Sequence, residues 1–246
     1  MIYLKELYET EKKHFHSQIR RDLFFELTQH KYLNFKPESK IIDIGCASGI
    51  FLEHLNEKGF KNLYGIDPNP ESIKFIKKNL PNINLYDLYL KDFLKEQKQK
   101  FDFVFLLDVL EHIKNDDTFL KEVKELLDNN SKVLISVPAF QWLWSDHDRI
   151  CNHFRRYSKK HLIKLLESCG YKIEFCSYYS TILFPLVVLQ KIISRIKKYK
   201  DHKSFLPSPF LNKLFKIIYK QEIPMLKRIT FPFGSSLICF ASKRKD

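Results

Sequence analysis

Residues 41–51, IIDIGCASGIF, decide the fold. The apolar run that opens this stretch predicts a short buried strand, and helical spacing begins at Phe51. Between the two lies a turn with Gly45 and Gly49, which permit a positive φ angle or a close approach of the backbone. Backbone amides at the start of the helix can therefore face a polar ligand. The stretch predicts a ligand-binding turn between a strand and a helix.

Strand and helix signals alternate regularly around this unit. Apolar strand segments are expected at residues 40–44, 63–66, 83–86, 101–107, 132–137, 171–179 and 236–242. Helical spacing is expected at residues 51–58, 71–79, 117–127 and, with an N-cap at Ser158, 158–168. Buried strands that alternate with helices predict an α/β protein with a parallel sheet covered on both faces.

The composition fits one domain with its own core. The 246 residues are 44% apolar and 15% aromatic, which excludes a disordered chain. Five cysteines, at positions 46, 151, 169, 176 and 239, form no C-x-x-C pair and leave one unpaired in any disulfide scheme, so we expect reduced thiols and a cytoplasmic protein. Charges interrupt the amino-terminal residues, and the longest apolar run, 182–189, is shorter than the roughly 20 residues of a membrane span. We expect neither export nor a membrane-spanning segment.

The positive charge is concentrated in the last quarter of the chain. Residues 190–246 contain 14 Lys and Arg against three acids, which is +11 of the total of +13. Apolar residues at helical spacing beside lysines predict helices at 186–198 and 210–220, inside a long insertion at 180–234. Such a segment points to an anionic partner, either a membrane surface or a nucleic acid, although biased composition alone can also produce it. Residues 4–32, ahead of the first strand, are also expected to be helical.

Acidic residues mark the ends of successive strands. Asp67 follows Asp43 by 24 residues and closes the second strand, where a carboxylate can accept hydrogen bonds from both hydroxyls of a ribose. Asp87 closes the third strand and Asp108 the fourth. Because ligands of open α/β sheets bind at the carboxyl edge of the strands, these residues predict a binding site there.

The same segments resemble the class I S-adenosylmethionine-dependent methyltransferases. The motifs IIDIGCASG, YGIDPNPESI, FDFVFLLDVLEHI and KVLISVP stand in the family's order over residues 40–140. PAFQWLWSDHDRICNHFRRY, KKHFHSQIRR and FPFGSSLICFASK resemble a bacterial and archaeal subfamily of these enzymes. The resemblance implies a Rossmann-like, seven-stranded, mostly parallel sheet with helices on both faces, an antiparallel last strand, and a helical insertion between strands 6 and 7. A dinucleotide site is disfavoured because G-x-G-x-x-G is absent.

The resemblance also implies S-adenosylmethionine as the cofactor and S-adenosylhomocysteine as its product. By this resemblance, the residues that hold the methionine part of the cofactor are Asp43, Gly45, Ala47 and Gly49, and the residue that holds the ribose is Asp67. The residues beside adenine are Pro68, Asp87 and Leu88, and those at the edge near the sulfonium are Leu107 and Asp108. The family usually has glycine where this chain has Ala47. A single methyltransferase domain over residues 1–246 is expected, made of an N-terminal helical lid (1–36), the cofactor-binding core (37–140), an acceptor segment (141–179), the basic amphipathic insertion (180–234) and the last strand (235–246).

An aromatic and basic cluster follows the fifth predicted strand. The predicted acceptor-binding residues are Trp142, Trp144, Asp148, Arg149, Arg155, Arg156 and Tyr157. Arginine can hold an anionic group bidentately, and aromatic rings can exclude water. The predicted proton acceptors are His112, His147 and His153. The alternative is a loop tied down by Arg–Asp pairs, with both tryptophans as core anchors and His153 satisfied by a neighbouring carbonyl.

Asp108, Glu111 and His112 are spaced so that they could share one face of a helical turn. This spacing suits a divalent cation, as a similar stretch does in quinone-biosynthesis O-methyltransferases, or a general base at His112. Capping of a helix by the two acids is the simpler interpretation, and no metal is assigned.

The predicted function is O-methylation of an anionic or lipid-linked small molecule, such as a sugar-phosphate, surface-glycan or isoprenoid/quinone precursor. The basic insertion predicts an acceptor-side lid that contacts an anionic membrane peripherally at its inner face. One alternative is RNA methylation, which is disfavoured because the chain has neither an appended RNA-binding module nor an Asn-Pro-Pro-Tyr-type sequence after the fourth strand. The other is a non-catalytic, cofactor-sensing interaction protein.

Overall fold

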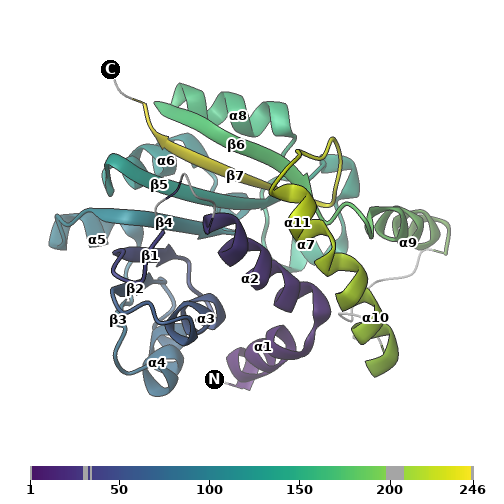
Figure 1. The fold of residues 1–246 in the computed structure, drawn as a ribbon, viewed down its shortest axis with the longest axis horizontal. Coiled ribbons are helices and arrows are strands. Elements are labelled where there is room, and N and C mark those ends of the chain that lie inside the picture. The colour runs from purple at the N-terminus through teal and green to yellow at the C-terminus, as the bar shows by residue number, and fades with distance from the viewer. Residues whose placement is uncertain (1, 30–32, 34, 198–207, 245–246) are drawn as a thin grey trace.

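A seven-stranded sheet forms the centre of the molecule (Figure 1). The computed structural model describes residues 2–29, 33, 35–197 and 208–244. The strands are β1 Ile41–Ile44, β2 Leu63–Ile66, β3 Asn84–Tyr86, β4 Phe101–Leu107, β5 Leu127–Pro138, β6 Tyr171–Tyr179 and β7 Ser236–Lys243. They lie in the order β3-β2-β1-β4-β5-β7-β6, with β1 to β5 parallel and β7 antiparallel to both β5 and β6. The predicted fold class, with its antiparallel last strand, is confirmed.

Helices connect the strands and cover both faces of the sheet. They are α1 Ile2–Lys13, α2 Phe15–Thr28, α3 Ile50–Glu57, α4 Pro70–Asn79, α5 Leu90–Glu96, α6 Asp116–Lys124, α7 Asp146–Ile150, α8 Lys159–Ser168, α9 Phe184–Lys197, α10 Pro209–Lys220 and α11 Glu222–Leu226, with 3₁₀ turns η1 Leu110–His112 and η2 Gln141–Leu143. Helix α2 contacts α1, α3, α10 and α11, whereas α6 contacts α5 and α8. Figure 1 shows α2 in front of the sheet and α6 behind it.

Apolar residues of the central strands form the core. Ile41 and Ile42 of β1, Val104 and Phe105 of β4, and Leu134 of β5 are fully buried. Parallel strands that are covered on both faces are continuously apolar, which is why the sequence predicted them well. The parallel registers of β1 with β2 and with β4 bring the carboxyl ends of these strands to one edge. The polar residues that follow the strands meet at that edge.

The amino-terminal segment differs from the prediction. The helical character expected over 4–32 is present as two helices, because His14 is extended (φ −73°, ψ 128°) and separates α1 from α2. The His14 imidazole accepts a hydrogen bond from the backbone amide of His16, so it acts as the N-cap of α2. The last three residues of the expected helix, 30–32, lie outside the described part of the chain.

A second difference lies between α6 and β5. The helix expected over 117–127 ends at Lys124, and β5 begins at Leu127 instead of residue 132. Leu127 is buried and pairs with Phe101 of β4, while an irregularity in the ladder separates this pair from the Phe103–Lys132 pair. Pairing with β4 therefore overrides the helical spacing of this apolar stretch. The short helices α5, α7 and α11 had not been predicted.

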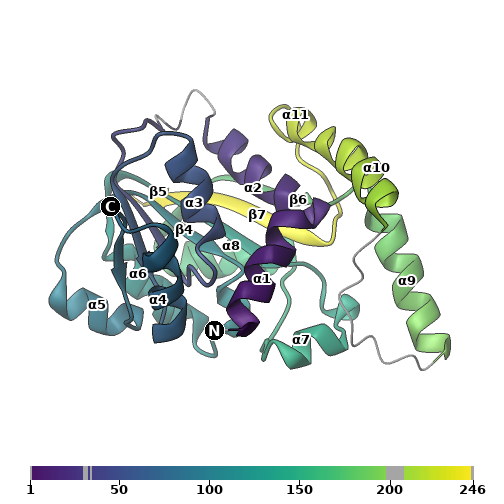
Figure 2. The same cartoon turned by 90° about the horizontal axis from the view of Figure 1, so that it is seen from below.

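The insertion between β6 and β7 is helical, as expected. Helices α9 and α10 start at Phe184 and Pro209, each slightly earlier than predicted, and residue 198 lies outside the described residues. Figure 2 shows α9, α10 and α11 along one side of the molecule. None of the helices in the described part of the chain is long and apolar enough to cross a membrane. All five cysteines are free.

Candidate functional site

The turn after β1 packs closely against neighbouring side chains. Gly45, Ala47 and Gly49 have φ angles of 73°, 46° and 74°, in the left-handed region that favours glycine. A Cβ atom at Gly49 would lie 2.7 Å from the Ile76 side chain, and one at Gly45 would lie 2.9 Å from Val109. Both glycines are therefore required for close packing as well as for conformation. Ala47 adopts the same region although it carries a Cβ.

Two buried carboxylates flank this turn in different ways. Asp67 is anchored, because its Oδ2 accepts a hydrogen bond from the Ala47 amide and its Oδ1 accepts one from the Asn69 amide, both at 2.9 Å. Asp43 Oδ1 is buried without a hydrogen-bond partner among the described residues. Burial, together with the charges of Asp67 and Glu11, raises the pKa of Asp43 to about 8. A buried carboxylate that lacks a partner fits a ligand with a cationic or hydrogen-donating group.

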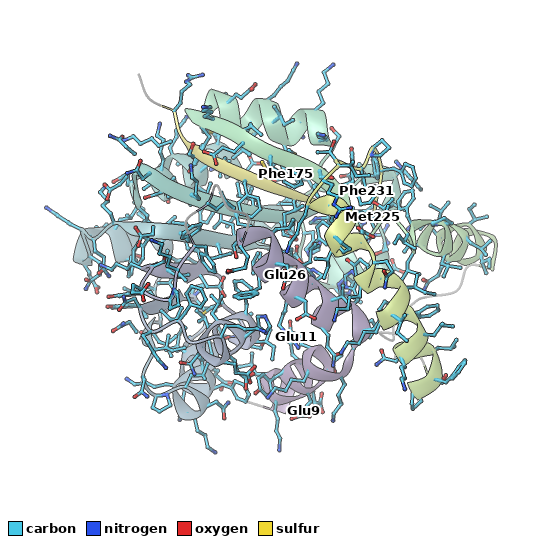
Figure 3. All side chains as sticks on the ribbon, viewed as in Figure 1. Glu9, Glu11, Glu26, Phe175, Met225 and Phe231 are labelled. Carbon is cyan, nitrogen blue, oxygen red and sulfur yellow. The ribbon has the colours of Figure 1, made fainter. Side chains whose placement is uncertain are left out.

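The amino-terminal helices close over the turn. Glu11 of α1 accepts a hydrogen bond from the Ser48 hydroxyl, and Figure 3 labels Glu11 where α1 meets the rest of the fold. Arg20 of α2 forms an ion pair with Asp108, whose other oxygen accepts a hydrogen bond from Ser136 Oγ at 2.9 Å. Burial would lower the pKa of the Arg20 guanidinium, but the Asp108 carboxylate outweighs burial and raises it. A cavity at this junction is lined by residues of α1, α2, β1, the turn, α3 and β4, including Asp43, Gly45, Ala47 and Asp108.

The other predicted cofactor residues lie along the same strand ends. Asp67 and Pro68 follow β2, Asp87 and Leu88 follow β3, and Leu107 ends β4 and lines the cavity. Asp87 and Pro68 are exposed, and Leu88 is partly buried. Sequence reasoning had not assigned a role to Glu11 or Arg20. The basic KKHFHSQIRR segment was a signal for Arg20, but its place in the cavity depends on the fold of α2 over β4.

One carboxylate, whose two oxygens both accept hydrogen bonds from the protein, holds the acceptor segment together. Asp148 is fully buried and accepts hydrogen bonds from Arg156 Nε and Nη2, each at 2.8 Å, and from Ser145 N at 2.7 Å. His153 Nδ1 lies 2.9 Å from the same carboxylate. Burial would raise the pKa of Asp148, but the hydrogen bonds of His153 and Arg156 outweigh it and hold the pKa well below its usual value. Asp148 and Arg156 are thus paired with each other.

The neighbouring acceptor candidates are also largely engaged by the protein. Arg155 donates to Asp116 and to the Lys114 carbonyl, each at 2.6 Å. The Tyr157 side chain is fully buried, and its hydroxyl donates to Asp116 at 2.8 Å. Arg149 forms a surface pair with Asp146. This arrangement agrees with the alternative of a loop tied down by Arg–Asp pairs.

The two tryptophans are not core anchors. The Trp142 side chain is 46% exposed and contacts the rings of Phe140 and Phe184, with centroid separations of 5.8 Å and 6.1 Å. Trp144 is partly buried, and its carbonyl accepts a hydrogen bond from Lys191 of α9. Both residues therefore connect the acceptor segment to the insertion.

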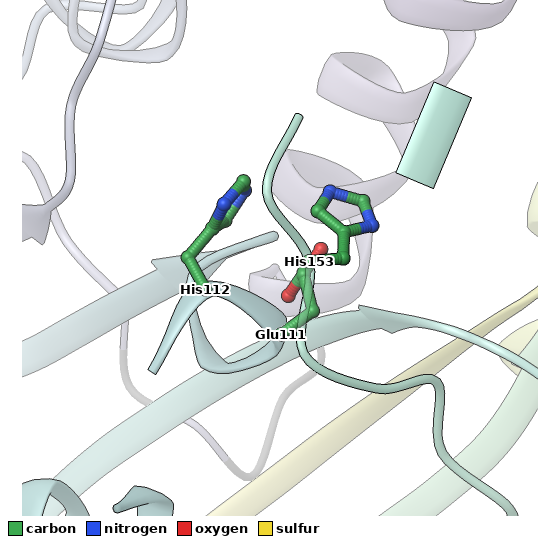
Figure 4. A group of neighbouring side chains, drawn as sticks. All are labelled: Glu111, His112 and His153. Carbon is green, nitrogen blue, oxygen red and sulfur yellow. The ribbon is translucent and has the colours of Figure 1, made fainter. Parts of the chain in front are cut away.

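Glu111, His112 and His153 form a compact cluster (Figure 4). Their potential ligand atoms all lie within 4.8 Å of one another, and the two imidazole rings are 4.5 Å apart at 89°. Glu111 Oε2 is buried without a partner in the described part of the chain, and burial with the nearby Asp108 raises the pKa of Glu111 well above its usual value. Burial and the proximity of His153 lower the pKa of His112.

The grouping expected from the sequence differs from this cluster. Asp108 does not join Glu111 and His112 on one helical face, because η1 is a single 3₁₀ turn and Asp108 is turned toward Arg20 and Ser136. His153 takes its place from the acceptor segment. The Asp148 carboxylate lies against Nδ1 of His153, so Nε2 is the ring nitrogen on the other side of the imidazole. His147 is exposed, and its ring lies 6.3 Å from that of His153.

Comparisons with known proteins agree with this geometry. A family model described as a methyltransferase domain matches residues 15–174. The tRNA U34 carboxymethyltransferase of Sulfurimonas denitrificans is 29% identical over 138 residues, which cover 55% of this chain and 46% of that protein. The ubiquinone biosynthesis O-methyltransferase of Pelagibacter ubique is 33% identical over 101 residues, which cover 39% of this chain and 41% of that protein. The chain thus spans less than half the length of these curated relatives.

Solved structures share the fold over nearly the whole chain. A SAM-dependent methyltransferase from Archaeoglobus fulgidus superposes with a TM-score of 0.56 at 21% identity, covering 93% of this chain and 98% of that one. The plantazolicin methyltransferase BamL, solved with a triazolic desmethylPZN analog and SAH, superposes with a TM-score of 0.64 at 17% identity, covering 99% and 90%. At these identities the likeness supports the fold alone. The family model and this shared fold together confirm the predicted resemblance to class I S-adenosylmethionine-dependent methyltransferases. The chain belongs to the methyltransferase-domain family.

Proposed function

We propose that this methyltransferase methylates an oxygen atom of an anionic or lipid-linked small molecule, such as a surface-glycan or isoprenoid/quinone precursor. The observation that carries the proposal is the close pair of His112 and His153, in which Asp148 orients His153 and the charge of Asp108, a residue that lines the cavity, acts on His112. Oxygen nucleophiles need a proton acceptor when they attack a methyl group, and a positioned neutral imidazole is the commonest one.

The cavity after β1 is the proposed cofactor site. S-adenosylmethionine supplies a methyl group on a positively charged sulfur that is itself the leaving group. Asp43 and the backbone of the turn would hold its methionine part, and the unpartnered Asp43 oxygen suits an ammonium group. The anchored Asp67 would hold the ribose, while Asp87 and Leu88 would flank adenine. Leu107 and Asp108 would border the reacting carbon.

The chain's own residues would do three things for the acceptor. Trp142 and Trp144 would cover its apolar part and exclude water. Arg149, whose side chain is 71% exposed, could exchange its surface partner for an anionic group. His153 or His112 would take the proton from the hydroxyl. Because Asp148, Arg155, Arg156 and Tyr157 are engaged by protein groups, their proposed contribution is to position this loop rather than to bind the acceptor.

The unpartnered Glu111 oxygen favours one addition to this scheme. Glu111, His112 and His153 offer the oxygen and nitrogen donors that a divalent transition metal accepts, and the Asp148 contact resembles the carboxylate that commonly orients a ligating histidine. Bound there, a metal would polarise the acceptor oxygen and ease the loss of its proton. If the purified protein contains no metal and keeps its turnover after treatment with a chelator, the metal is not needed. Histidine alone would then accept the proton.

RNA is the second candidate acceptor, because the relatives in Sulfurimonas denitrificans and others are named tRNA U34 carboxymethyltransferases. The basic composition agrees with either acceptor. The two proposals predict transfer of the methyl group to different fractions of the cell.

A fractionation experiment separates them. The purified protein and methyl-tritiated S-adenosylmethionine are incubated with lipid, small-molecule and RNA fractions of cells that express the protein. We expect label as an O-methyl group in the lipid or small-molecule fraction, and label confined to RNA would contradict the proposal. His112→Ala and His153→Ala are then compared with the matched variant His161→Ala, which changes an exposed histidine of α8.

At least one of the two cluster variants should lower turnover by about 10²- to 10⁴-fold with little change in cofactor affinity. The His161 variant should keep normal turnover. If both cluster variants also keep it, catalysis proceeds by positioning alone and the proposed base is wrong.

A further inference from the structure

The outer side of the insertion is unusually apolar for an exposed surface. Ten of the 14 exposed large hydrophobic side chains of the described residues belong to it. We name this group the apolar outer face; it comprises Leu186, Leu189, Ile192, Ile193, Phe210, Leu214, Ile217, Met225, Ile229 and Phe233. Exposure in this group ranges from 39% at Leu214 to 75% at Phe210. Scattered single apolar residues are normal on protein surfaces, but a gathering of this kind indicates an interaction site.

In helix α10, the residues of the apolar outer face do not lie on the side that packs against the rest of the protein. Its inner side is already used, since Tyr219 is 1% exposed and the ring of Phe215 lies 5.4 Å from that of Phe15. Phe210, Leu214 and Ile217 stand at spacings of four and three residues, so they form a second stripe on the outward side. A helix that is apolar on two sides leaves its second side open to a partner outside its own fold.

The exposed charges that the described part of the insertion itself carries have one sign. Lys213 and Lys220 of α10 are exposed, and so is Arg228, which follows α11. Among described residues 184–197 and 208–229 the acid is Glu222, and it is fully buried with its carboxylate accepting hydrogen bonds from the Thr181 and Ile182 amides. A surface with exposed apolar side chains, lysines and no exposed acid in this described range complements an anionic lipid surface.

Helix α9, which carries part of the apolar outer face, also contacts the acceptor segment. The Trp142 ring contacts Phe184 at the start of α9, and Lys191 donates to the Trp144 carbonyl. Figure 2 shows α7 and α9 along the lower right of the molecule, on the side where α10 and α11 also lie. A surface bound through the insertion would therefore lie close to the loop that is proposed to bind the acceptor.

Helix α10 also connects this face to the helices that close the cavity. Asn212 accepts a hydrogen bond from the Phe15 amide and donates one to the Lys13 carbonyl, both at 2.9 Å. These two residues flank His14, where α1 and α2 join. The inner side of α10 thus supports the junction beside the cofactor cavity, while its outer side remains available to a partner.

We propose that the apolar outer face docks on the surface of an anionic phospholipid membrane and presents the acceptor segment to it. This proposal rests on the proposed function only where it assumes a lipid-linked acceptor. Binding to the membrane can be measured without methyl transfer. Apolar side chains enter the interface and the lysines meet the headgroups, each lysine contributing on the order of 1 kcal/mol. The contact is peripheral and reversible.

Vesicle co-sedimentation of the full chain tests this. Wild-type protein should bind vesicles that contain phosphatidylglycerol at low salt, bind pure phosphatidylcholine much less, and lose binding as salt rises. The double variant Lys213→Gln/Lys220→Gln should bind about 30-fold more weakly, as follows from two lysines. Leu214→Ser/Ile217→Ser should lose at least about tenfold.

Two matched variants change equally exposed residues elsewhere. Lys77→Gln/Lys78→Gln alters exposed lysines at the end of α4, and Tyr89→Ser alters a side chain that is 68% exposed after β3. Both should bind vesicles as the wild type does. Calorimetric titration with S-adenosylmethionine, repeated on every variant, shows that each is folded and distinguishes failure of docking from failure of the proposed cofactor site.

Three outcomes would overturn the proposal. Absence of vesicle binding at low salt is the first. The second is a concentration-dependent dimer that Leu214→Ser/Ile217→Ser abolishes without any vesicle binding, because a second copy would then cover the face. The third is tight RNA binding that Lys213→Gln/Lys220→Gln abolishes while vesicle binding is unchanged.

Discussion

Asp43 and Asp148 are both buried aspartates, yet their surroundings are opposite. Asp148, in the acceptor segment, accepts hydrogen bonds from Arg156 and Ser145 and contacts His153, so its pKa is lowered. Asp43, at the end of β1, leaves one oxygen without a partner among the described residues, and its pKa is raised to about 8. A charge that is fully paired holds structure together, whereas an unpaired one is costly unless a ligand completes it.

The difference separates two kinds of site in this molecule. Around Asp43, the turn and the strand ends provide groups that the protein itself does not satisfy. Around Asp148, the protein satisfies nearly every group and leaves the cluster of Glu111, His112 and His153 as the reactive part. We therefore expect changes at Asp148 to affect stability and changes at the β1 edge to affect cofactor binding.

The largest expected effect on stability is that of Asp148→Ala. Removing this carboxylate leaves the largely buried Arg156 without its ion-pair partner, which should lower the free energy of unfolding by about 3–5 kcal/mol. Asp146→Ala is the matched variant, because it breaks the exposed pair with Arg149 and should cost at most about 1 kcal/mol. Denaturant titrations of both variants measure the difference. Similar losses would remove the distinction between the two regions.

A smaller effect is expected from pH. The raised pKa of Asp43 means that the folded protein keeps a proton which the unfolded chain has lost, so the free energy of unfolding should fall as pH rises from about 4 toward 8. Burial, partly offset by amide hydrogen bonds, also raises the pKa of Glu222 to about 7, which adds a slope of the same sign. Each of these two groups changes the free energy of unfolding by at most about 1.4 kcal/mol per pH unit.

Asp43→Asn and Glu222→Gln should each flatten this slope in the cofactor-free protein. Urea titrations at pH 5, 6, 7 and 8 provide the comparison. An unchanged slope in Asp43→Asn would mean that this carboxylate is ionised in the folded protein, and the contrast with Asp148 would then be lost. Asp148 acts with the opposite sign: its lowered pKa contributes stability that is present above about pH 4 and lost in strong acid.

The smallest expected effect concerns the backbone of the two regions. Ala47 at φ 46° and Asn152 at φ 55° are both in the left-handed region. Ala47→Gly should relieve strain and raise stability by up to about 1 kcal/mol, whereas Asn152→Gly should change it less because asparagine tolerates this conformation. Thermal unfolding of both variants measures this. A lower melting temperature for Ala47→Gly would show that unfolded-state entropy outweighs the strain.

The fold was largely predictable because its central strands are buried on both faces and therefore continuously apolar. Three of the residues singled out at the strand ends, Asp43, Gly45 and Asp108, line the cavity for a related reason, since each ends or follows a buried strand. Local patterns did not predict the break at His14, which depends on a side-chain cap. Nor did they predict the start of β5 at Leu127, which depends on pairing with Phe101.

The candidate site was predicted less completely than the fold. Sequence reasoning placed Asp148 and Arg156 among the acceptor-binding residues, but could not tell that they pair with each other across eight residues. It grouped Asp108 with Glu111 and His112, whereas Arg20 of α2 draws Asp108 away. The first contact joins two residues of the acceptor segment and the second joins α2 to the end of β4, and neither follows from a local pattern of residues.

Calorimetric titration of the purified protein with S-adenosylmethionine tests the central claim, that the edge formed by β1 to β4 binds the cofactor. We predict saturable binding by the wild type and a loss of at least about 100-fold in Asp67→Ala, since Asp67 anchors the turn and would hold the ribose through charged hydrogen bonds. Asp92→Ala, which changes an exposed carboxylate of α5, should bind normally. Unchanged affinity in a folded Asp67→Ala variant would contradict the account.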